Sequence, residues 1–269
     1  MACEFWTAAR RPTIWLMNEV LYEMTEGIAL ITINRPERLN TLNGAMRDAL
    51  FQAFHRFEAD ASARVAILAA AGDRAFCAGR DLKDPEQAGM REVKRGYLPI
   101  LGDSVKVSKP VIAAVNGPAF ALGFVFVQMC DMCVASEHAT FAVTEVKLSR
   151  GVAWAVPLAS MVPRKVLSEL LLTCAPISAQ RAHEIGLVNH VVARDQVMAK
   201  AMELAKAVTA SPPLAVKAAR EVIDAACDQA LINAYEQAYE ATAPVYASED
   251  ALEGIRAFLE KRSPVWRGR

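Results

Sequence analysis

The hydrophobic positions of this chain form short continuous runs that alternate with helical patterns over the first 190 residues. The runs 19–25 and 28–34 flank Glu26-Gly27 and predict a β-hairpin. Further short apolar runs predict buried strands at 65–72, at 111–117 and, as two pieces, within 132–143.

Amphipathic segments between these runs predict helices. In 44–58 the apolar residues Met46, Leu50, Phe54 and Phe57 share one helical face. The other expected helices are a segment that ends at Val107, 157–173 and 178–185. Beyond residue 194 the pattern is helical almost throughout. This order predicts an α/β fold with a helical C-terminal lobe.

We expect three parts along the chain: an N-terminal extension (1–18), a core (19–194) and the helical C-terminal lobe (195–269). The first sixteen residues, MACEFWTAARRPTIWL, fit neither a secretory signal nor a transit peptide, because their apolar stretch is short and interrupted. We expect either that Met17 is the physiological start or that this segment is a mobile extension.

Composition narrows the class of protein. Apolar residues make up 54% and charged residues 22%, which indicates a soluble globular protein with a sizeable core. Thirty basic and thirty acidic side chains cancel, which gives no argument for a nucleic-acid or membrane partner. Six cysteines scattered among apolar residues favour reduced, buried thiols in a cytoplasmic protein. Cys130-x-x-Cys133 has no second pair, and the four histidines lack ligand spacing, so we expect no metal.

Two glycine-containing turns are candidates for binding a negatively charged oxygen. In RAFCAGRDLKD (74–84), Ala78-Gly79 follows a strand, and small residues there let a ligand approach the Ala78 N–H. In NGPAFALGFVFVQMCD (116–131), a helix begins near Leu122-Gly123, where the first N–H groups have no intrahelical partner. Each turn alone is also explained as ordinary structure, but together they outline an oxyanion hole.

A third segment, FAVTEVKLSRG (141–151), carries the candidate acid or base. Glu145 stands among apolar residues, and a carboxyl group in such surroundings has a raised pKa that suits proton transfer. The alternative is a surface glutamate on an edge strand. The chain contains no G-x-G-x-x-G, P-loop or G-x-S-x-G motif, which counts against nicotinamide, nucleotide-hydrolysing and serine-hydrolase functions.

These segments resemble the enoyl-CoA hydratase/isomerase (crotonase) superfamily. The resemblance rests on ITINRPERLNTLN, AFCAGRDLK, KPVIAAVNGPAFALGF, MCD, ATFAVTEVKL, ISAQRAHEIGLVNHVV and the C-terminal AFLEKRSPVW. It implies a spiral of repeated ββα units, a C-terminal lobe that forms a homotrimer or a dimer of trimers, and an acyl-CoA thioester as the partner and substrate. No cofactor is implied beyond the coenzyme A of the substrate. The resemblance assigns the backbone N–H groups of Ala78 and Leu122 to the oxyanion hole and Glu145 to proton transfer.

The chain departs from the hydratase pattern at three places. The position of the second hydratase glutamate is Val125, which cannot activate water. Leu122 replaces a glycine; its N–H remains, but its side chain narrows the site or forces a shift. The turn after the catalytic glutamate is SRGVAWAVP (149–157), which brings Arg150 and Trp154 near the acyl pocket.

The resemblance also suggests substrate-binding residues. Arg38 and Leu39 would flank coenzyme A, Lys83 would lie near the oxyanion turn, and Phe258 and Lys261 would reach a neighbour's site in the trimer. The residues around the two donors complete the expected set: Phe76, Cys77, Gly79, Arg80, Asp81, Leu82, Gly123, Val125, Arg150 and Trp154.

The expected activity is that of an acyl-CoA-transforming enzyme that stabilises a thioester enolate. A single glutamate favours an enoyl-CoA double-bond isomerase. An enoyl-CoA hydratase, or an acyl-CoA lyase or hydrolase with a non-standard water site, is the alternative within the superfamily. A non-catalytic acyl-CoA-binding protein is the alternative of another class.

Overall fold

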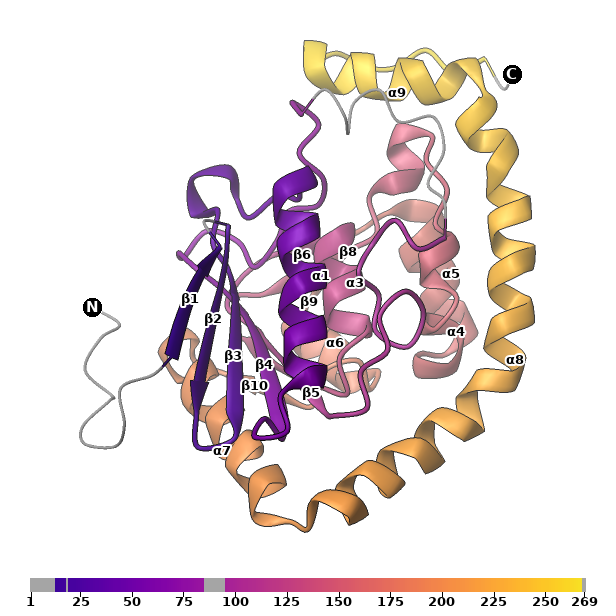
Figure 1. Cartoon of the computed structure of the whole chain (residues 1–269). Coiled ribbons are helices and arrows are strands. Elements are labelled where there is room, and N and C mark those ends of the chain that lie inside the picture. Colours follow the sequence, from indigo (N-terminus) through magenta and orange to yellow (C-terminus); the bar gives the residue numbers. More distant parts are fainter. Residues whose placement is uncertain (1–12, 18, 85–94, 268–269) are drawn as a thin grey trace.

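The protein contains two β-sheets (Figure 1). The structure is a computed structural model, and it describes residues 13–17, 19–84 and 95–267. The large sheet has the strand order β1-β2-β3-β4-β5-β7-β10, and the small one has the order β6-β8-β9. The strands of the large sheet are β1 (Thr13–Met17), β2 (Val20–Thr25), β3 (Ile28–Ile33), β4 (Val65–Ala70), β5 (Val111–Val115), β7 (Met132–Ser136) and β10 (His190–Val192). Those of the small sheet are β6 (Ala119–Phe120), β8 (Thr140–Ala142) and β9 (Ile177–Ser178).

The predicted hairpin and buried strands are confirmed. β2 pairs antiparallel with β3 in the register Val20↔Ile33, and β3 to β10 run parallel along the rest of the sheet. Parallel strands are covered on both faces, which explains why β4 and β5 are continuous apolar runs without alternation.

The expected boundary of the N-terminal extension at residue 18 is wrong. Residues 13–17 already form the edge strand β1, which pairs antiparallel with β2 in the register Met17↔Val20. The apolar run TIWLM therefore adds one strand to the hairpin, at the edge of the large sheet.

Helices cover both faces of the large sheet. On one face lies α1 (Gly44–Ala59), which Asn43 caps by accepting a hydrogen bond from the Met46 N–H. On the other face, α7 (Val197–Ala210) packs with Val197, Ala201 and Ala205 into a cluster with sheet residues. The predicted division at residue 195 therefore does not separate α7 from the core, because this helix covers strands β4, β5 and β7.

Two predicted helices differ in the structure. The described part of the segment that ends at Val107, residues 95–107, forms turns in which Gly102 adopts a φ of +83° and the Ser104 hydroxyl accepts a hydrogen bond from the Ile100 N–H. The segment 157–173 is split into α4 (Leu158–Met161) and α5 (Arg164–Thr173). Pro163 separates them, because a proline forces the preceding residue into an extended conformation.

The remaining elements connect the sheets and form the C-terminal part. They are the 3₁₀ helices η1 (Pro36–Arg38), η2 (Glu145–Leu148), η3 (Ala153–Ala155) and η4 (Arg194–Gln196), and the α-helices α3 (Leu122–Gln128), α6 (Ala179–Glu184), α8 (Pro213–Ala247) and α9 (Glu249–Glu260). In Figure 1, α8 runs along the right edge of the molecule and α9 crosses its top. They contact η3 and η2, respectively.

The C-terminal helices leave apolar side chains on the surface. Leu214, Val222 and Ile223 of α8 and Phe258 of α9 are exposed. The homotrimer or dimer of trimers remains an expectation that such faces would serve. Within the described residues, no helix combines the length and the apolar character that crossing a membrane requires.

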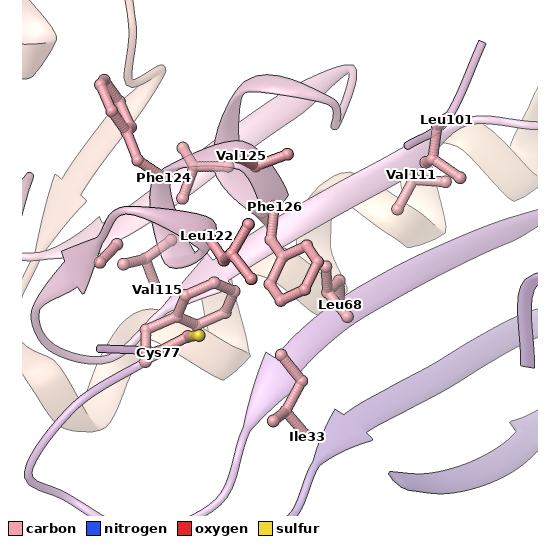
Figure 2. Packing of buried hydrophobic residues seen from close by; sticks show 14 of the residues in the cluster. Ile33, Leu68, Cys77, Leu101, Val111, Val115, Leu122, Phe124, Val125 and Phe126 are labelled. Carbon is pink, nitrogen blue, oxygen red and sulfur yellow. The ribbon is translucent and has the colours of Figure 1, made fainter. Parts of the chain in front are cut away.

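The core is closely packed where α3 meets the turn after β4. Figure 2 shows α3 with its buried side chains, including Leu122, Val125 and Phe126, among residues of the neighbouring strands. A β-carbon on Gly123 would lie only 2.1 Å from the Cys77 carbonyl oxygen. Glycine is therefore required at this position for α3 to approach the turn that contains Cys77.

We predict that Gly123→Ala lowers the free energy of unfolding by about 3 kcal/mol or more, because the new methyl group clashes with backbone that cannot move aside. Chemical denaturation measures this. Gly186→Ala is the matched control: its φ is +85°, but nothing lies within 4 Å of the added β-carbon, so only about 1 kcal/mol is expected. Equal losses in the two variants would refute the proposed clash.

Candidate active site

A cavity of about 410 Å³ lies between the two glycine-containing turns, η2 and the C-terminal helices. Eight residues that the sequence suggested for the site line this cavity: Ala78, Arg80, Leu82, Leu122, Glu145, Arg150, Trp154 and Phe258. The three expected catalytic positions therefore share one cavity, although they come from separate parts of the chain.

Backbone hydrogen bonds bring the two turns together. The Phe76 N–H donates to the Pro118 carbonyl at 3.0 Å, and the Phe120 N–H donates to the Cys77 carbonyl at 2.9 Å. These two bonds pair the segment just before Ala78 with the segment just before Leu122. The positions of Ala78 and Leu122 relative to one another are therefore fixed by main chain rather than by side chains.

The two expected oxyanion donors differ in their hydrogen bonding. Leu122 is the first residue of α3, and within the described residues its N–H has no hydrogen-bond partner. The Ala78 N–H, in contrast, donates to the Leu39 carbonyl at 3.1 Å. The role of Ala78 as a donor to the substrate stays a prediction, and it requires the Ala78 N–H to exchange or share this partner.

Ala121 sets the direction of the Leu122 N–H. Its backbone has φ +51° and ψ −114°, a region that residues with a side chain rarely adopt and that costs about 1–3 kcal/mol. The Ala121 N–H donates to the Ala142 carbonyl at 2.9 Å, which holds this conformation in place. The strained turn leads the chain into α3, whose first residue, Leu122, lines the cavity.

Glu145 begins η2 rather than standing on a strand, so the alternative of an edge-strand surface glutamate is wrong. Its Oε1 accepts a hydrogen bond from the Trp154 Nε1–H at 3.0 Å. Its Oε2 is inaccessible to solvent and has no hydrogen-bond partner among the described residues. One oxygen is thus fixed, and the other is buried without a partner in a residue that lines the cavity.

Burial raises the pKa of Glu145 to about 7, against partial compensation by its own N–H, the Trp154 indole and the charge of Arg80. A carboxyl group with a pKa near neutrality can both accept and return a proton under physiological conditions. The sequence-based expectation of a raised pKa is therefore confirmed together with its cause.

Trp154 is itself held firmly. Its ring meets the Phe124 ring edge-on with 6.2 Å between the centroids, and its carbonyl accepts a hydrogen bond from Gln128 Nε2 at 2.6 Å. Both partners belong to α3, the helix that carries Leu122. Glu145 and Leu122, the residues expected to transfer the proton and to donate to the oxyanion, are therefore linked through one packed unit.

Four expected substrate-binding residues belong to the core instead. Phe76, Cys77, Gly123 and Val125 are buried and do not line the cavity. Figure 2 shows Val125 on α3 within the core cluster. The position expected to face the substrate beside Glu145 thus packs into the protein, and Gly123 serves the close approach to Cys77.

Six further expected residues also lie outside the cavity. The Asp81 carboxylate pairs with Arg35 at 3.2 Å, and the Gly79 carbonyl accepts a hydrogen bond from the Leu42 N–H at 2.8 Å. Both contacts hold the oxyanion turn in place. Four others lie on the surface, and their contact with coenzyme A stays a prediction: Arg38, Leu39, Lys83 and Lys261. Phe258 lines the cavity of its own chain, and its contact with a neighbour's site also stays a prediction.

The sequence did not identify several lining residues. Phe120, Ala121, Thr144, Lys147, Leu148, Gly151 and Ala153 adjoin predicted positions, and Leu98, Tyr239, Tyr246 and Ile255 come from elsewhere. The neighbours could have been found by extending each motif by a few residues. Tyr239 and Tyr246 carry no local signal, because their contribution depends on where α8 packs.

Cys77, Cys130 and Cys133 are structural. Burial raises the pKa of the Cys77 thiol to about 12 and the pKa values of the Cys130 and Cys133 thiols well above their usual range. Such thiols are poor nucleophiles and poor metal ligands near neutral pH. Among the described residues, no group of three or more His, Cys, Asp or Glu side chains could hold a metal ion.

The sequence matches the family model described as enoyl-CoA hydratase/isomerase over residues 23–269. The chain therefore belongs to the enoyl-CoA hydratase/isomerase family, and it is an acyl-CoA-transforming enzyme with the crotonase fold. This agrees with the resemblance that the motifs carry.

Individual relatives refine the comparison. The chain is 37% identical to a carnitinyl-CoA dehydratase of Proteus mirabilis, with 94% of this chain and 100% of that protein covered. It is 36% identical to a carnitinyl-CoA dehydratase of Salmonella typhi, with the same coverage. The crystal structure of a carnitinyl-CoA hydratase from Mycobacterium avium matches with a TM-score of 0.84 and 35% identity, and covers 93% of this chain and 99% of that one.

We predict a specific pH dependence of stability for Glu145→Gln. The folded pKa of Glu145 lies above the unfolded value, so folding favours the protonated form and stability falls as the pH rises from about 4.5 to about 7. The pKa difference corresponds to roughly 3 kcal/mol. Glutamine does not ionise and avoids this loss.

Urea denaturation of both proteins at pH 4.5 and pH 8 measures the effect. The wild-type chain should lose roughly 3 kcal/mol relative to the variant between these two pH values. The comparison cancels every other titrating group, since both proteins share them. Parallel pH profiles would show that the Glu145 carboxyl is not desolvated.

Proposed function

We propose that this enzyme catalyses the reversible elimination of water from a 3-hydroxyacyl-CoA thioester to give a 2-enoyl-CoA. The observation that carries the proposal is the Glu145 carboxyl: its pKa is raised, one of its oxygens is buried without a partner, and the residue lines the same cavity as Leu122. The dehydratase and hydratase names of the relatives favour this reaction over the double-bond isomerisation expected from the sequence.

The first step is removal of a proton from C2 of the thioester. The Glu145 carboxylate accepts the proton, and the C–H electron pair moves into the enolate. The Leu122 N–H donates to the enolate oxygen, and the Ala78 N–H joins it after leaving the Leu39 carbonyl. Donors aimed at developing charge in a site with little water are among the strongest catalytic effects that proteins use.

The second step is loss of the hydroxyl group from C3. The enolate electrons form the C2–C3 double bond as the C3–O bond breaks, and protonated Glu145 gives its proton to the departing oxygen to form water. One carboxyl group thus serves first as base and then as acid. Only protons move between enzyme and substrate, so the reaction needs no cofactor beyond the coenzyme A of the substrate.

Isomerisation is the second candidate, and it shares the first step. Protonated Glu145 would then return its proton to C4 of a dienolate instead of giving it to an oxygen at C3. The presence of one carboxyl group among the described residues that line the cavity supports this alternative. The two reactions differ only in the atom that receives the proton.

The test offers the enzyme a 2-enoyl-CoA (crotonyl-CoA) and a 3-enoyl-CoA and follows ultraviolet absorbance and product mass. Our proposal predicts addition of one water molecule to the first, with kcat/KM for the reverse dehydration rising with pH to a plateau above about 7. Glu145→Gln should lower this activity by roughly 10²–10⁴-fold. Conversion of the 3-enoyl-CoA without any hydration would replace the proposal by the isomerase alternative.

A separate prediction concerns the Leu122 N–H. Replacing Leu122 by its α-hydroxy acid turns the amide into an ester, which removes the N–H and keeps the side chain. We expect kcat to fall by roughly 10²–10³-fold, as for loss of one oxyanion-hole donor. The same replacement at Val127, which does not line the cavity, is the control for effects on stability. Equal kcat values for the two ester proteins would remove Leu122 from the mechanism.

A further inference from the structure

Trp154 is a side chain that contacts the Glu145 carboxyl directly. It lies in η3, nine residues after Glu145, and its indole N–H donates to Glu145 Oε1 at 3.0 Å. Both residues line the cavity. The backbone N–H groups of Thr144 and Glu145 also favour the charged form of this carboxyl. The indole can therefore influence the group that is expected to transfer the proton.

The Trp154 indole is held in place without the help of Glu145. Trp154 is 6% exposed, and its ring meets the Phe124 ring at 80°, with 6.2 Å between the centroids. Its backbone carbonyl accepts a hydrogen bond from Gln128 Nε2 at 2.6 Å. A buried indole N–H needs an acceptor, but packing does not require that this acceptor be ionisable. The position of the N–H is thus set by the core, and the Glu145 carboxyl is oriented by it.

An indole N–H acts differently on the two forms of a carboxyl group. It can donate but not accept, and it binds a carboxylate more strongly than a neutral acid because negative charge strengthens the bond. Burial acts in the other direction, and it raises the pKa of Glu145 to about 7. The hydrogen bond from Trp154 opposes this effect. The amount of ionised Glu145 near neutral pH therefore depends on this bond.

Other ionisable groups surround Glu145. The Arg80 charge lowers the pKa of Glu145, and the Tyr246 hydroxyl interacts with its carboxylate. Besides Glu145, the ionisable side chains that line the cavity are Arg80, Lys147, Arg150, Tyr239 and Tyr246. The helix α9 packs on η2 and carries Glu249, Asp250, Glu253, Arg256 and Glu260, whereas α3 and η3 carry no ionisable side chain. Proteins that differ only at Trp154 share all these groups, so their comparison isolates the indole.

We propose that Trp154 is a positioning residue that keeps the Glu145 carboxyl oriented and ionised for removal of the substrate proton. The proposal rests on the proposed function, because it concerns the base of that reaction. Trp154 exchanges no proton itself and acts through Glu145. Because Phe124 and Gln128 of α3 hold Trp154, the base is oriented by the same helix that begins with Leu122.

The first test is the pH profile of kcat/KM for dehydration of 3-hydroxybutyryl-CoA by the wild type and by Trp154→Phe. Phenylalanine keeps an aromatic ring against Phe124 but has no N–H. We expect the midpoint of the rising limb, at about 7 in the wild type, to move upward by about one pH unit. Near neutral pH this shift lowers kcat/KM about fivefold, and the activity recovers at higher pH. The same loss at every pH, with an unmoved midpoint, would indicate a merely structural role and overturn the proposal.

Two further variants separate the N–H from the shape of the ring. Replacing Trp154 by 3-benzothienylalanine keeps the bicyclic shape and puts sulfur in place of the N–H, so the midpoint should move as in Trp154→Phe. If Trp154→Phe does not fold, this protein decides. A shift in Trp154→Phe alone would assign the effect to ring size and overturn the proposal. Trp266→Phe is the matched control, because Trp266 is exposed and does not line the cavity, and it should keep the wild-type midpoint.

The second test needs no turnover. The difference in unfolding free energy between the wild type and Glu145→Gln changes with pH until the pH exceeds the folded pKa of Glu145. Without the indole N–H this pKa is higher. The difference between Trp154→Phe and the double variant Trp154→Phe, Glu145→Gln should therefore keep changing to a pH about one unit higher. Urea denaturation measures both pairs, and identical pH ranges would overturn the proposal. The benzothienylalanine protein replaces Trp154→Phe here too if the latter does not fold.

The two proposals fail separately. Dehydration of 3-hydroxybutyryl-CoA with the same midpoint in all Trp154 variants would leave the proposed function intact and refute the inference. A shifted pH range of stability without turnover of any hydroxyacyl-CoA or enoyl-CoA would refute the proposed function and support control of the Glu145 carboxyl by Trp154.

Discussion

The close approach of α3 to the turn after β4 is the constraint on which the site depends. Gly123 has no β-carbon, so the Cys77 carbonyl can lie against the helix backbone, and the Phe120 N–H completes the contact by donating to the same carbonyl. This main-chain contact places Ala78 and Leu122 on one cavity. Side chains can then vary in the cavity without displacing these two backbone positions, which suits a fold that can carry different functions.

The parts of the fold that the sequence predicted are those with strong local patterns. The hairpin, β4 and β5 follow from continuous apolar runs, and α1 follows from its single apolar face. The failures have two different causes, one local and one non-local. Segment 157–173 has a helical pattern throughout, but Pro163 interrupts it. α7 was assigned to a separate lobe because its pattern does not reveal that its partner is the sheet.

The residues of the candidate site also fall into those that the sequence could predict and those that it could not. Glu145, Ala78 and Leu122 were found because each lies in a segment with its own chemical signal, and the cavity unites them. Val125 was expected to face the substrate, yet it packs in the core. Tyr239 and Tyr246 could not be found, because only the packing of α8 against η3 brings them to the cavity. A residue with a local chemical signal can be recognised in the sequence, whereas the other residues that line its cavity depend on tertiary packing.

The hydrogen bond between the Ala78 N–H and the Leu39 carbonyl gives the site an internal competitor. A thioester carbonyl is a neutral acceptor much like the peptide carbonyl it displaces, so the exchange gains little when the substrate binds. An enolate oxygen carries negative charge and accepts far more strongly. In the proposed reaction, the Ala78 N–H therefore exchanges the Leu39 carbonyl for the substrate oxygen favourably only as the proton leaves C2. This hydrogen bond would then stabilise the transition state without stabilising the bound substrate.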